Sequence, residues 1–316
     1  MLRPSPTLRG GAVIALAATA SLVLAACGSS SPSSNPLSGG SSNGSVVIGS
    51  ANFPENELLA EIYSLALKAK GVKVTDKFNI GSREVYYPEI KKGAVSIIPE
   101  YNGTLLTVIV DKNSTAASTT DVNAALTAGL PSTLEILSSS SAQDSDSVTV
   151  SQAFATAHHL TSSSSIADLA PFASSMVFGG PPECTTRSDC VPGLKKNYGL
   201  TFKSFSPLDE SGPITIKALQ DGTVQAADVF TTTPQIATDH FVTLQDPKFN
   251  FAAENVTPLV YKPAMTSTIT DTLNAISAKL TTAGLLQIDT AVIVNHDSYQ
   301  AAAQAWLKAE GLPGGA

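Results

Sequence analysis

The chain has 316 residues, with 19 Lys or Arg and 26 Asp or Glu, so its formal net charge is −7. Residues 1–26 carry two of the Arg and no acid, and without them the excess of acidic side chains is larger still. An acidic chain with no basic stripe is not expected to bind nucleic acid. Beyond the first 45 residues, its length suits one large or two medium domains.

The N-terminus has the pattern of an export signal. Arg3 and Arg9 precede an apolar run over residues 11–26, which is short for a membrane span and is typical of a signal peptide. The stretch Leu24–Cys27 resembles the bacterial lipobox, which implies cleavage before Cys27 and lipidation of its sulfur. The alternative is an ordinary signal peptide with an incidental cysteine.

Residues 27–45 are almost all Ser, Gly, Pro and Asn. Such a segment cannot form a core, and it is expected to act as a flexible tether. With a signal peptide over residues 1–26, this composition predicts a protein held by a lipid at the extracytoplasmic face of the cell membrane.

Helix and strand patterns alternate along the rest of the chain. Residues 46–50 are apolar and β-branched. Residues 52–71 then have a helical apolar face, with Asn52 as a possible N-cap and Gly71 at the end. Further strands are expected at 72–80 and 223–233, and further helices at 82–93, 212–222, 277–294 and 297–311. This alternation predicts an α/β fold with largely parallel sheets.

Polar residues follow one short apolar strand, which is expected at residues 95–98. The sequence Pro99-Glu100-Tyr101-Asn102-Gly103 is expected to end that strand and delivers a carboxyl, a phenol and an amide to one point. Ligands bind at strand ends in open α/β sheets. The segment is therefore a candidate ligand site, the alternative being a polar turn.

Cys184 and Cys190 are the two cysteines outside the N-terminal segment. Their spacing fits no common zinc pattern, and an oxidising exterior favours a disulfide that closes the short loop between them. Two free thiols are the alternative.

Nothing in the sequence argues for catalysis, a cofactor or a metal. A Gly-x-Ser-x-Gly match at residues 40–44 lies in the tether, without the strand and helix that a nucleophile elbow needs. The adjacent side chains of His158 and His159 diverge, and His240 and His296 belong to no motif. We expect a protein that is not an enzyme.

Four segments carry a family resemblance, and they are printed here in chain order: "VIGSANFPENELLAEIYSLALKAKG", "IGSREVYYPEIKKGAVSIIPEYNGT", "GGPPECTTRSDCVPGLKKNYGL" and "SPLDESGPITIKALQDGTVQAADVFTTT". They resemble the substrate-binding proteins of osmoprotectant ABC importers, the ProX-like group, which bind glycine betaine, choline or related quaternary amines. The resemblance covers residues 46–311, nearly the whole chain after the tether.

The resemblance implies a two-lobed periplasmic-binding-protein fold with a ligand cleft between the lobes and two crossover hinges. We expect residues 46–141 and 234–316 to form lobe 1 and residues 142–233 to form lobe 2. The implied partners are a small-molecule ligand and the membrane permease subunits of an ABC importer. The protein itself is expected to be a monomer.

Two residues match the family's ligand-binding motifs directly. Tyr101 matches a tyrosine that forms one wall of an aromatic cage around the quaternary ammonium, and Arg187 matches an arginine that meets the ligand carboxylate. The alternative for Tyr101 is a turn residue that packs on its own lobe. The alternative for Arg187 is a surface salt bridge with Asp189 or Glu183.

The rest of the family's cage is not kept. Ala51 stands where the family usually has a lysine. Asp146 and Glu254 stand where it has tyrosines, and Phe230 replaces another ring. Asn52 and Thr104 complete the expected ligand-binding set.

Three interpretations of the function stay open. The first is capture of an osmoprotectant-type amine for import. The second is the same fold binding a hydroxylated or aromatic molecule that stacks on Tyr101 and Phe230. The third is a surface sensor that reuses the fold without transport.

Overall fold

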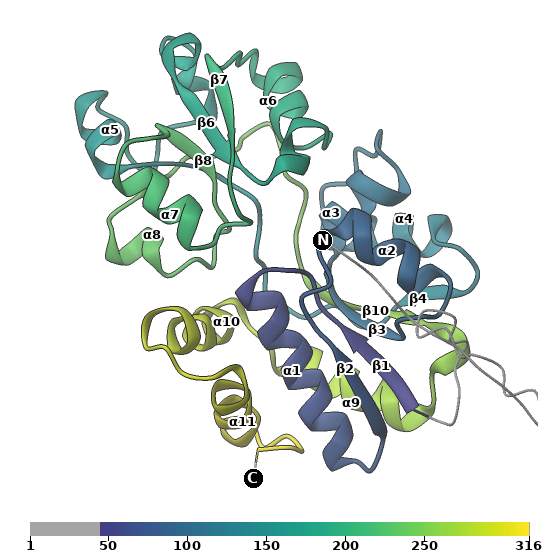
Figure 1. The fold of residues 1–316 in the computed structure, drawn as a ribbon. Helices are drawn as coiled ribbons and strands as arrows, with labels where there is room; N and C mark the ends of the chain where they lie inside the picture. The colour runs from purple at the N-terminus through teal and green to yellow at the C-terminus, as the bar shows by residue number, and fades with distance from the viewer. Residues whose placement is uncertain (1–44, 316) are drawn as a thin grey trace, which may run out of the picture. The chain divides into compact units, whose positions relative to one another are not determined.

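A computed structural model describes residues 45–315 (Figure 1). The expected signal peptide, the lipidation site at Cys27 and the tether up to residue 44 lie outside the described residues. Within the described part, no helix combines the length and the hydropathy needed to cross a membrane.

The first sheet has five strands in the order β2-β1-β3-β10-β4. Its strands are β1 (Ser45–Gly49), β2 (Lys73–Lys77), β3 (Ile97–Tyr101), β4 (Leu134–Ile136) and β10 (Val256–Tyr261). β1 runs parallel to β2 and β3, whereas β10 is antiparallel to both β3 and β4. We call the part of the chain built on this sheet the first lobe.

The second sheet has five strands in the order β7-β6-β8-β5-β9. Its strands are β5 (Val148–Val150), β6 (Val177–Gly180), β7 (Ser204–Pro207), β8 (Ala226–Asp228) and β9 (Val242–Thr243). β6 runs parallel to β7 and β8, and β5 is antiparallel to β8 and β9. This part is the second lobe. The α/β class is as expected, but both sheets are mixed and not largely parallel.

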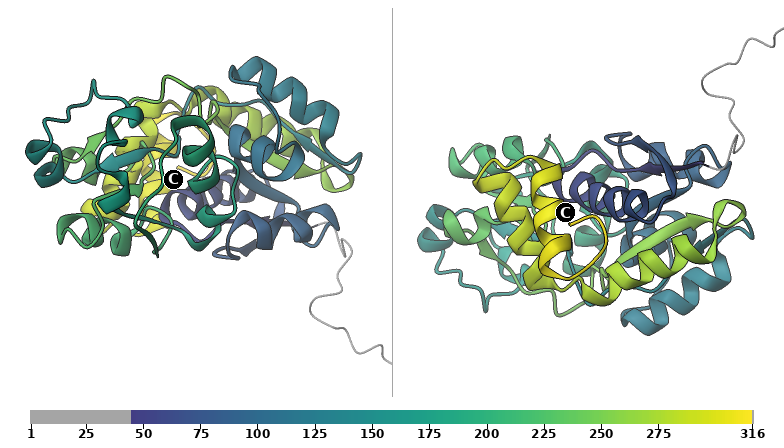
Figure 2. Two further views of the ribbon diagram at one scale, coloured as in Figure 1. Left: turned by 90° about the horizontal axis from the view of Figure 1, so that it is seen from above. Right: turned by 90° about the horizontal axis from the view of Figure 1, so that it is seen from below.

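Helices cover both sheets. In the first lobe they are α1 (Pro54–Ala69), α2 (Arg83–Lys91), α3 (Asn102–Thr104), the π-helical turn η1 (Leu105–Val110), α4 (Thr119–Gly129), η5 (Lys262–Ala264), α9 (Ser267–Lys279), α10 (Thr282–Asp289), η6 (Thr290–Val294) and α11 (Tyr299–Ala309). In the second lobe they are α5 (Gln152–Ala157), η2 (Ile166–Leu169), η3 (Ala173–Ser175), η4 (Pro182–Thr185), α6 (Val191–Tyr198), α7 (Pro213–Gln220) and α8 (Gln235–Thr238). Figure 2 shows the C-terminal helices α10 and α11 beside α1, which they contact.

Helix α1 follows the predicted apolar periodicity, since Leu58, Leu59 and Ile62 are all fully buried against the first sheet. Its start differs from the expectation. Pro54 occupies the first turn, where a missing N–H costs nothing. The preceding cap is Phe53, so Asn52 is not the cap.

Strand β3 is longer than the sequence predicts. It continues through Pro99 to Tyr101 instead of ending at Ile98, because Pro99 lies opposite Pro258 of the antiparallel neighbour β10. Neither proline has an N–H, so no backbone donor is left unpaired where the two prolines face each other, and the pairing of β3 with β10 continues past them. As a result, Glu100 and Tyr101 lie in extended conformation at the end of the strand and not in a turn.

The second crossover differs from the one expected at residue 233. β9 pairs with β5, and Leu244 lies in the second lobe's core, so the chain has not yet returned to the first lobe there. It returns at Asn255, which pairs with Gln143 of the first crossing. Residues 231–233 contact the first lobe without crossing into it. The contact is a hydrogen bond that the Thr232 hydroxyl donates to Glu55. We therefore propose that the second lobe extends to about residue 253.

The helix expected over residues 277–294 is split. Helix α9 ends at Lys279, and α10 begins after Thr281, whose hydroxyl accepts from the N–H of Gly284. A local cap of this kind starts a new helix at a point where the apolar pattern alone predicts one continuous helix. The end of this region winds into the π-helical turn η6.

Candidate functional site

A small cavity lies where segments of both lobes meet. Its lining follows the carboxyl ends of several strands, as expected for an open α/β sheet. Residues Ala51 and Phe53 follow β1, Tyr101 ends β3, and Glu210 follows β7. The remaining lining residues are Arg83, Tyr86, Thr104, Asp144, Asp146, Arg187, Phe230 and Glu254.

Most residues expected from the sequence line this cavity together. They are Tyr101, Thr104, Asp146, Arg187, Phe230 and Glu254. Asn52 is the exception, because its side chain is exposed and its two neighbours line the cavity in its place.

Five lining residues were not anticipated: Phe53, Arg83, Tyr86, Asp144 and Glu210. A signal existed for Arg83 and Tyr86, which lie three positions apart at the start of a predicted helix and therefore share a face. No comparable local signal marks Asp144 or Glu210, which depend on how distant segments meet.

Three aromatic rings form one side of the cavity. The ring centroid of Phe53 lies 5.9 Å from that of Tyr101 and 5.0 Å from that of Phe230, the latter in edge-to-face geometry. The Tyr101 hydroxyl donates to Oε1 of Glu55 at 2.5 Å. This bond fixes the ring's orientation while the ring itself lines the cavity.

Glu100, which the sequence left as a possible ligand contact, is buried behind the cavity. Nη2 of Arg83 lies 2.9 Å from its Oε2, and the Tyr86 hydroxyl donates to its Oε1 at 2.8 Å. The backbone N–H of Tyr101 also donates to Oε2 at 3.0 Å. Because a buried carboxylate needs such donors, Glu100 occupies the guanidinium of Arg83 and holds this wall together.

Arg187 crosses between the lobes. Its Nε and Nη2 each lie 3.1 Å from an oxygen of Glu84 on α2, and Nη2 lies 3.6 Å from Oε1 of Glu210. The partners considered from the sequence, Asp189 and Glu183, do not form this bridge. Burial alone would raise the pKa of Glu84, but the bonds from Arg187 outweigh it and lower that pKa to about 2.

Carboxyl groups outnumber guanidinium groups in the lining, four against two. Oε1 of Glu254 accepts from the Thr104 hydroxyl at 2.5 Å, and Oδ1 of Asp144 accepts from the N–H of Thr232 at 3.0 Å. Among the described residues, Oε2 of Glu210 and Oε2 of Glu254 have no hydrogen-bond partner. The cavity therefore offers acceptors that a ligand with positive charge or N–H and O–H donors would satisfy.

Burial shifts the ionisation of these carboxyls toward neutral pH. It raises the pKa of Asp146 to about 6, with Asp189 adding to the rise, and that of Glu210 to about 7 against the opposing charge of Arg187. The pKa of Glu254 also rises, through burial and then through the charge of Asp146. The charge of the site therefore changes within the physiological pH range.

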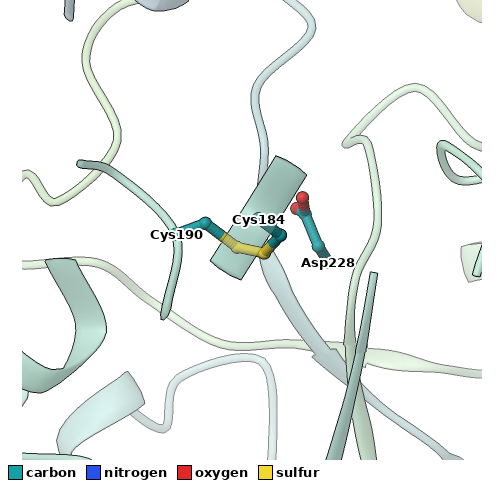
Figure 3. Close-up of side chains that lie close together, drawn as sticks. All are labelled: Cys184, Cys190 and Asp228. Atoms are coloured by element: carbon teal, nitrogen blue, oxygen red, sulfur yellow. A yellow bond between two sulfur atoms is a disulfide. The ribbon is translucent and has the colours of Figure 1, made fainter. Parts of the chain in front are cut away.

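A disulfide joins Cys184 and Cys190, whose Cα atoms are 5.1 Å apart (Figure 3). It closes the loop that carries Arg187, and both cysteines are buried. A carboxylate oxygen of Asp228 lies within 4.8 Å of both sulfurs. Because the sulfurs are bonded to each other, they provide no thiolates for a metal ion at this point.

Two α/β lobes, joined by two paired crossing segments and enclosing a lined cavity, define a two-lobed solute-binding protein. The comparisons with known proteins agree. The family model described as "Substrate binding domain of ABC-type glycine betaine transport system" (OpuAC) matches residues 44–309. The chain therefore belongs to this family, whose members are extracytoplasmic substrate-binding components of ABC importers and not enzymes.

Solved structures show the same fold. A glycine betaine/carnitine/choline ABC transporter protein is 20% identical, with a TM-score of 0.66 over 84% of this chain and 98% of that one. YehZ from Escherichia coli is 25% identical, with a TM-score of 0.59 over 85% and 99%. Lactococcal OpuAC, solved closed around glycine betaine, is 14% identical, with a TM-score of 0.59 over 85% and 97%.

Proposed function

We propose that this chain is the lipid-anchored, monomeric receptor of an ABC importer and that it captures a small quaternary amine of the choline type. The ligand is held in the cavity between the lobes and handed to the permease subunits. Anchoring through Cys27 keeps the receptor near its permease. The family membership supports the role, and the chemistry of the lining supports the ligand class.

The observation that carries the choice of ligand is the combination of rings and free carboxyl oxygens in one cavity. A quaternary ammonium cannot donate an N–H bond, so ring faces and negative charge are what hold it. Tyr101, Phe53 and Phe230 offer the rings, and each desolvated contact of this kind is worth roughly 0.5–2 kcal/mol. Glu210 and Glu254 offer carboxyl oxygens that have no partner in the described part of the chain.

Choline fits this lining better than glycine betaine does. The carboxylate of glycine betaine needs a guanidinium, and both candidates are engaged: Arg83 by Glu100 and Arg187 by Glu84. A ligand carboxylate would have to compete with Glu84 for Arg187. Choline instead carries a hydroxyl, which can donate to a carboxyl oxygen of the cavity.

Closure around the ligand is supported by contacts that join the lobes beside the cavity. The Thr107 hydroxyl donates to Oδ2 of Asp189 at 2.8 Å, and the Ser188 hydroxyl donates to the carbonyl of Thr107 at 3.0 Å. These bonds and the Arg187–Glu84 pair exist only while the lobes are together. A ligand that touches both lobes favours this state in proportion to its differential affinity for it.

A second ligand class is favoured by the raised pKa values of the lining carboxyls. With pKa values of about 6 and about 7, Asp146 and Glu210 are partly protonated near neutral pH and can both donate and accept hydrogen bonds. A neutral hydroxylated molecule stacked on Tyr101 and Phe230 would use that property.

Isothermal titration calorimetry on the full chain distinguishes these ligands. Choline and tetramethylammonium should bind, glycine betaine should bind more weakly than choline, and a neutral polyol should not compete. Tetramethylammonium isolates the contribution of the rings and charge, because it has no donor at all. Tighter binding of glycine betaine than of choline would reject the proposed selectivity, and absence of binding by all three amines would reject the proposed ligand class.

A further inference from the structure

A second cavity adjoins the first. The two share Phe53, Phe230 and Glu210, so the edge-to-face pair of phenylalanine rings forms part of the wall between them. The second cavity extends from this wall toward α7 of the second lobe and toward α10 and η6 of the first. It is therefore also lined from both lobes.

The chemistry of the second cavity differs from that of the first. Its sides are apolar and come mainly from Pro213, Ile216, Val292 and Ile293. Neither Lys nor Arg is among its described lining residues, whereas the first cavity has two Arg. The charged lining consists of Glu55, Glu210 and Asp289, with an exposed His296 at the margin.

Three buried hydrogen-bond acceptors of residues that line this cavity have no partner among residues 45–315. They are Oδ1 of Asp289, Oε2 of Glu210 and Oε1 of Gln235. Asp289 is only 2% exposed and Glu210 only 7%. An unsatisfied buried polar group costs about 1–3 kcal/mol, so a ligand that brings donors to these oxygens gains what the protein alone lacks.

The unpaired acceptors distinguish this cavity from a mere packing gap. Glu55, beside Asp289, is already satisfied, because it accepts from the hydroxyls of Tyr101 and Thr232 at 2.5 and 2.6 Å. Oδ1 of Asp289 has no partner in the described part of the chain. Burial raises the pKa of the Asp289 carboxyl to about 8, and a cation bound beside it would favour the ionised form. An ammonium group can donate N–H bonds to acceptors of this kind, whereas a quaternary ammonium, which has no N–H, cannot.

We infer that the second cavity is a binding site for a protonated primary amine on an apolar body, such as an arylalkylamine, with its ammonium at Asp289 and its body against Ile216 and Val292. This site goes beyond the proposed capture of a quaternary amine and does not depend on it. The shared phenylalanine pair places the two ligands on opposite faces of the same rings.

The test is calorimetric titration of the full chain with 2-phenylethylamine. Its neutral isostere 2-phenylethanol measures the contribution of the charge, and choline reports on the first cavity. Val292→Trp fills the second cavity from a half-buried position. Val294→Trp is the matched control on the same turn, since Val294 is 38% exposed and does not line the cavity. Asp289→Asn replaces the ionisable carboxyl with a neutral amide and keeps the shape.

We expect 2-phenylethylamine to bind the wild-type chain and the Val294→Trp control equally. Val292→Trp and Asp289→Asn should each weaken this binding by roughly tenfold or more, as expected when a hot-spot contact is lost. Asp289→Asn should leave the weaker binding of 2-phenylethanol unchanged. The melting temperature of each variant reports whether it is folded.

Absence of saturable binding of 2-phenylethylamine to the wild-type chain would overturn the inference. So would wild-type affinity in both folded variants, or equal affinity for the amine and the alcohol. Failure of choline to bind while 2-phenylethylamine binds through Asp289 would reject the proposed quaternary-amine function and leave this inference standing.

Discussion

Arg187 and Glu84 join the two lobes through a two-point ion pair, in which Nε and Nη2 of the guanidinium each lie 3.1 Å from a carboxylate oxygen. The arginine is nearly buried, with 8% of its side chain exposed, whereas the Glu84 side chain is 38% exposed. The pair both holds the lobes together and occupies the cation that a ligand carboxylate would need. Ligand selectivity should therefore depend on Glu84.

Glu84→Gln should shift selectivity toward glycine betaine. The substitution removes the charge that competes for Arg187, so the affinity ratio of glycine betaine to choline should rise by roughly tenfold, which is about 1.4 kcal/mol. Titration calorimetry with both ligands measures the ratio. Glu89→Gln on the same helix is the control, since Glu89 pairs with Lys92 and does not line the cavity. An unchanged ratio in Glu84→Gln would show that Arg187 does not govern carboxylate binding.

Tyr101→Ala should weaken choline binding by roughly 1–3 kcal/mol, because it removes a ring and the shape that the ring provides. Tyr101→Phe keeps the ring and should retain most of the affinity. It should instead lower the stability of the fold, because Glu55 loses the hydroxyl that donates to it at 2.5 Å. Calorimetry and thermal unfolding separate the two effects. Equal losses of affinity in both variants would argue against a ring contact.

The affinity for choline should rise with pH. The pKa of Asp146 is raised to about 6 and that of Glu210 to about 7, mainly by burial, so both become negative as the pH passes through these values. An ionised carboxylate holds a cation better than a protonated one does. Titrations across this range measure the effect, and Glu210→Gln should remove the part near pH 7. A flat profile in the wild-type chain would contradict the expectation.

The raised pKa of Glu210 also predicts that the ligand-free chain becomes less stable as the pH rises, whereas its affinity for choline increases. The pKa of Glu210 is raised from 4.5 to about 7 in the folded state, so between these values the folded chain binds more protons than the unfolded one. The free energy of unfolding should therefore fall as the pH rises from about 4.5 to about 7. Chemical denaturation at several pH values measures the slope, which should be shallower in Glu210→Gln.

The disulfide should stabilise the loop that presents Arg187. Replacing Cys184 and Cys190 together by Ser should lower the free energy of unfolding by roughly 2 kcal/mol in the chain-entropy model. Denaturation with and without reductant checks this in the wild-type chain. Mass spectrometry of the non-reduced exported protein should find neither cysteine alkylated. Two alkylatable thiols would contradict the pairing.

Cys27→Ala should release the protein into the medium or leave it unprocessed. The expectation rests on the apolar run that ends in Leu24–Cys27 and on the polar segment that follows. Detergent partitioning of the exported protein measures the anchor. Equal partitioning of mutant and wild type, after equal processing, would argue against lipidation.

Local patterns predict much of this fold. The apolar period of residues 58–66 predicts the buried face of α1, and the alternation of elements predicts the α/β class. Tyr101 and Arg187 were predicted as ligand contacts because their motifs are short and continuous in the chain, and both residues line the cavity. Such features are encoded within one turn of helix or one strand, where side-chain spacing and backbone geometry are directly linked.

Long-range features were missed for a corresponding reason. The crossover expected at residue 233 lies instead near Asn255, because strand pairing of β9 and not composition decides which sheet a segment joins. Asp144 and Glu210 line the cavity but were not predicted from the sequence. Their position in the lining depends on which segment of the other lobe faces them, and the residues next to them in the sequence do not predict that contact.

The sequence by itself determined the class of protein, some of the aromatic and acidic residues that line the cavity, and the loop that carries Arg187. Only the tertiary structure decided the partner of that arginine. Asp189 and Glu183 are close in the chain, yet the guanidinium pairs with Glu84, which is 103 positions away. Side chains near in sequence pair only if the backbone turns them toward each other. In this chain the contact between the lobes brings Glu84 within reach, and the desolvated setting strengthens the pair that forms.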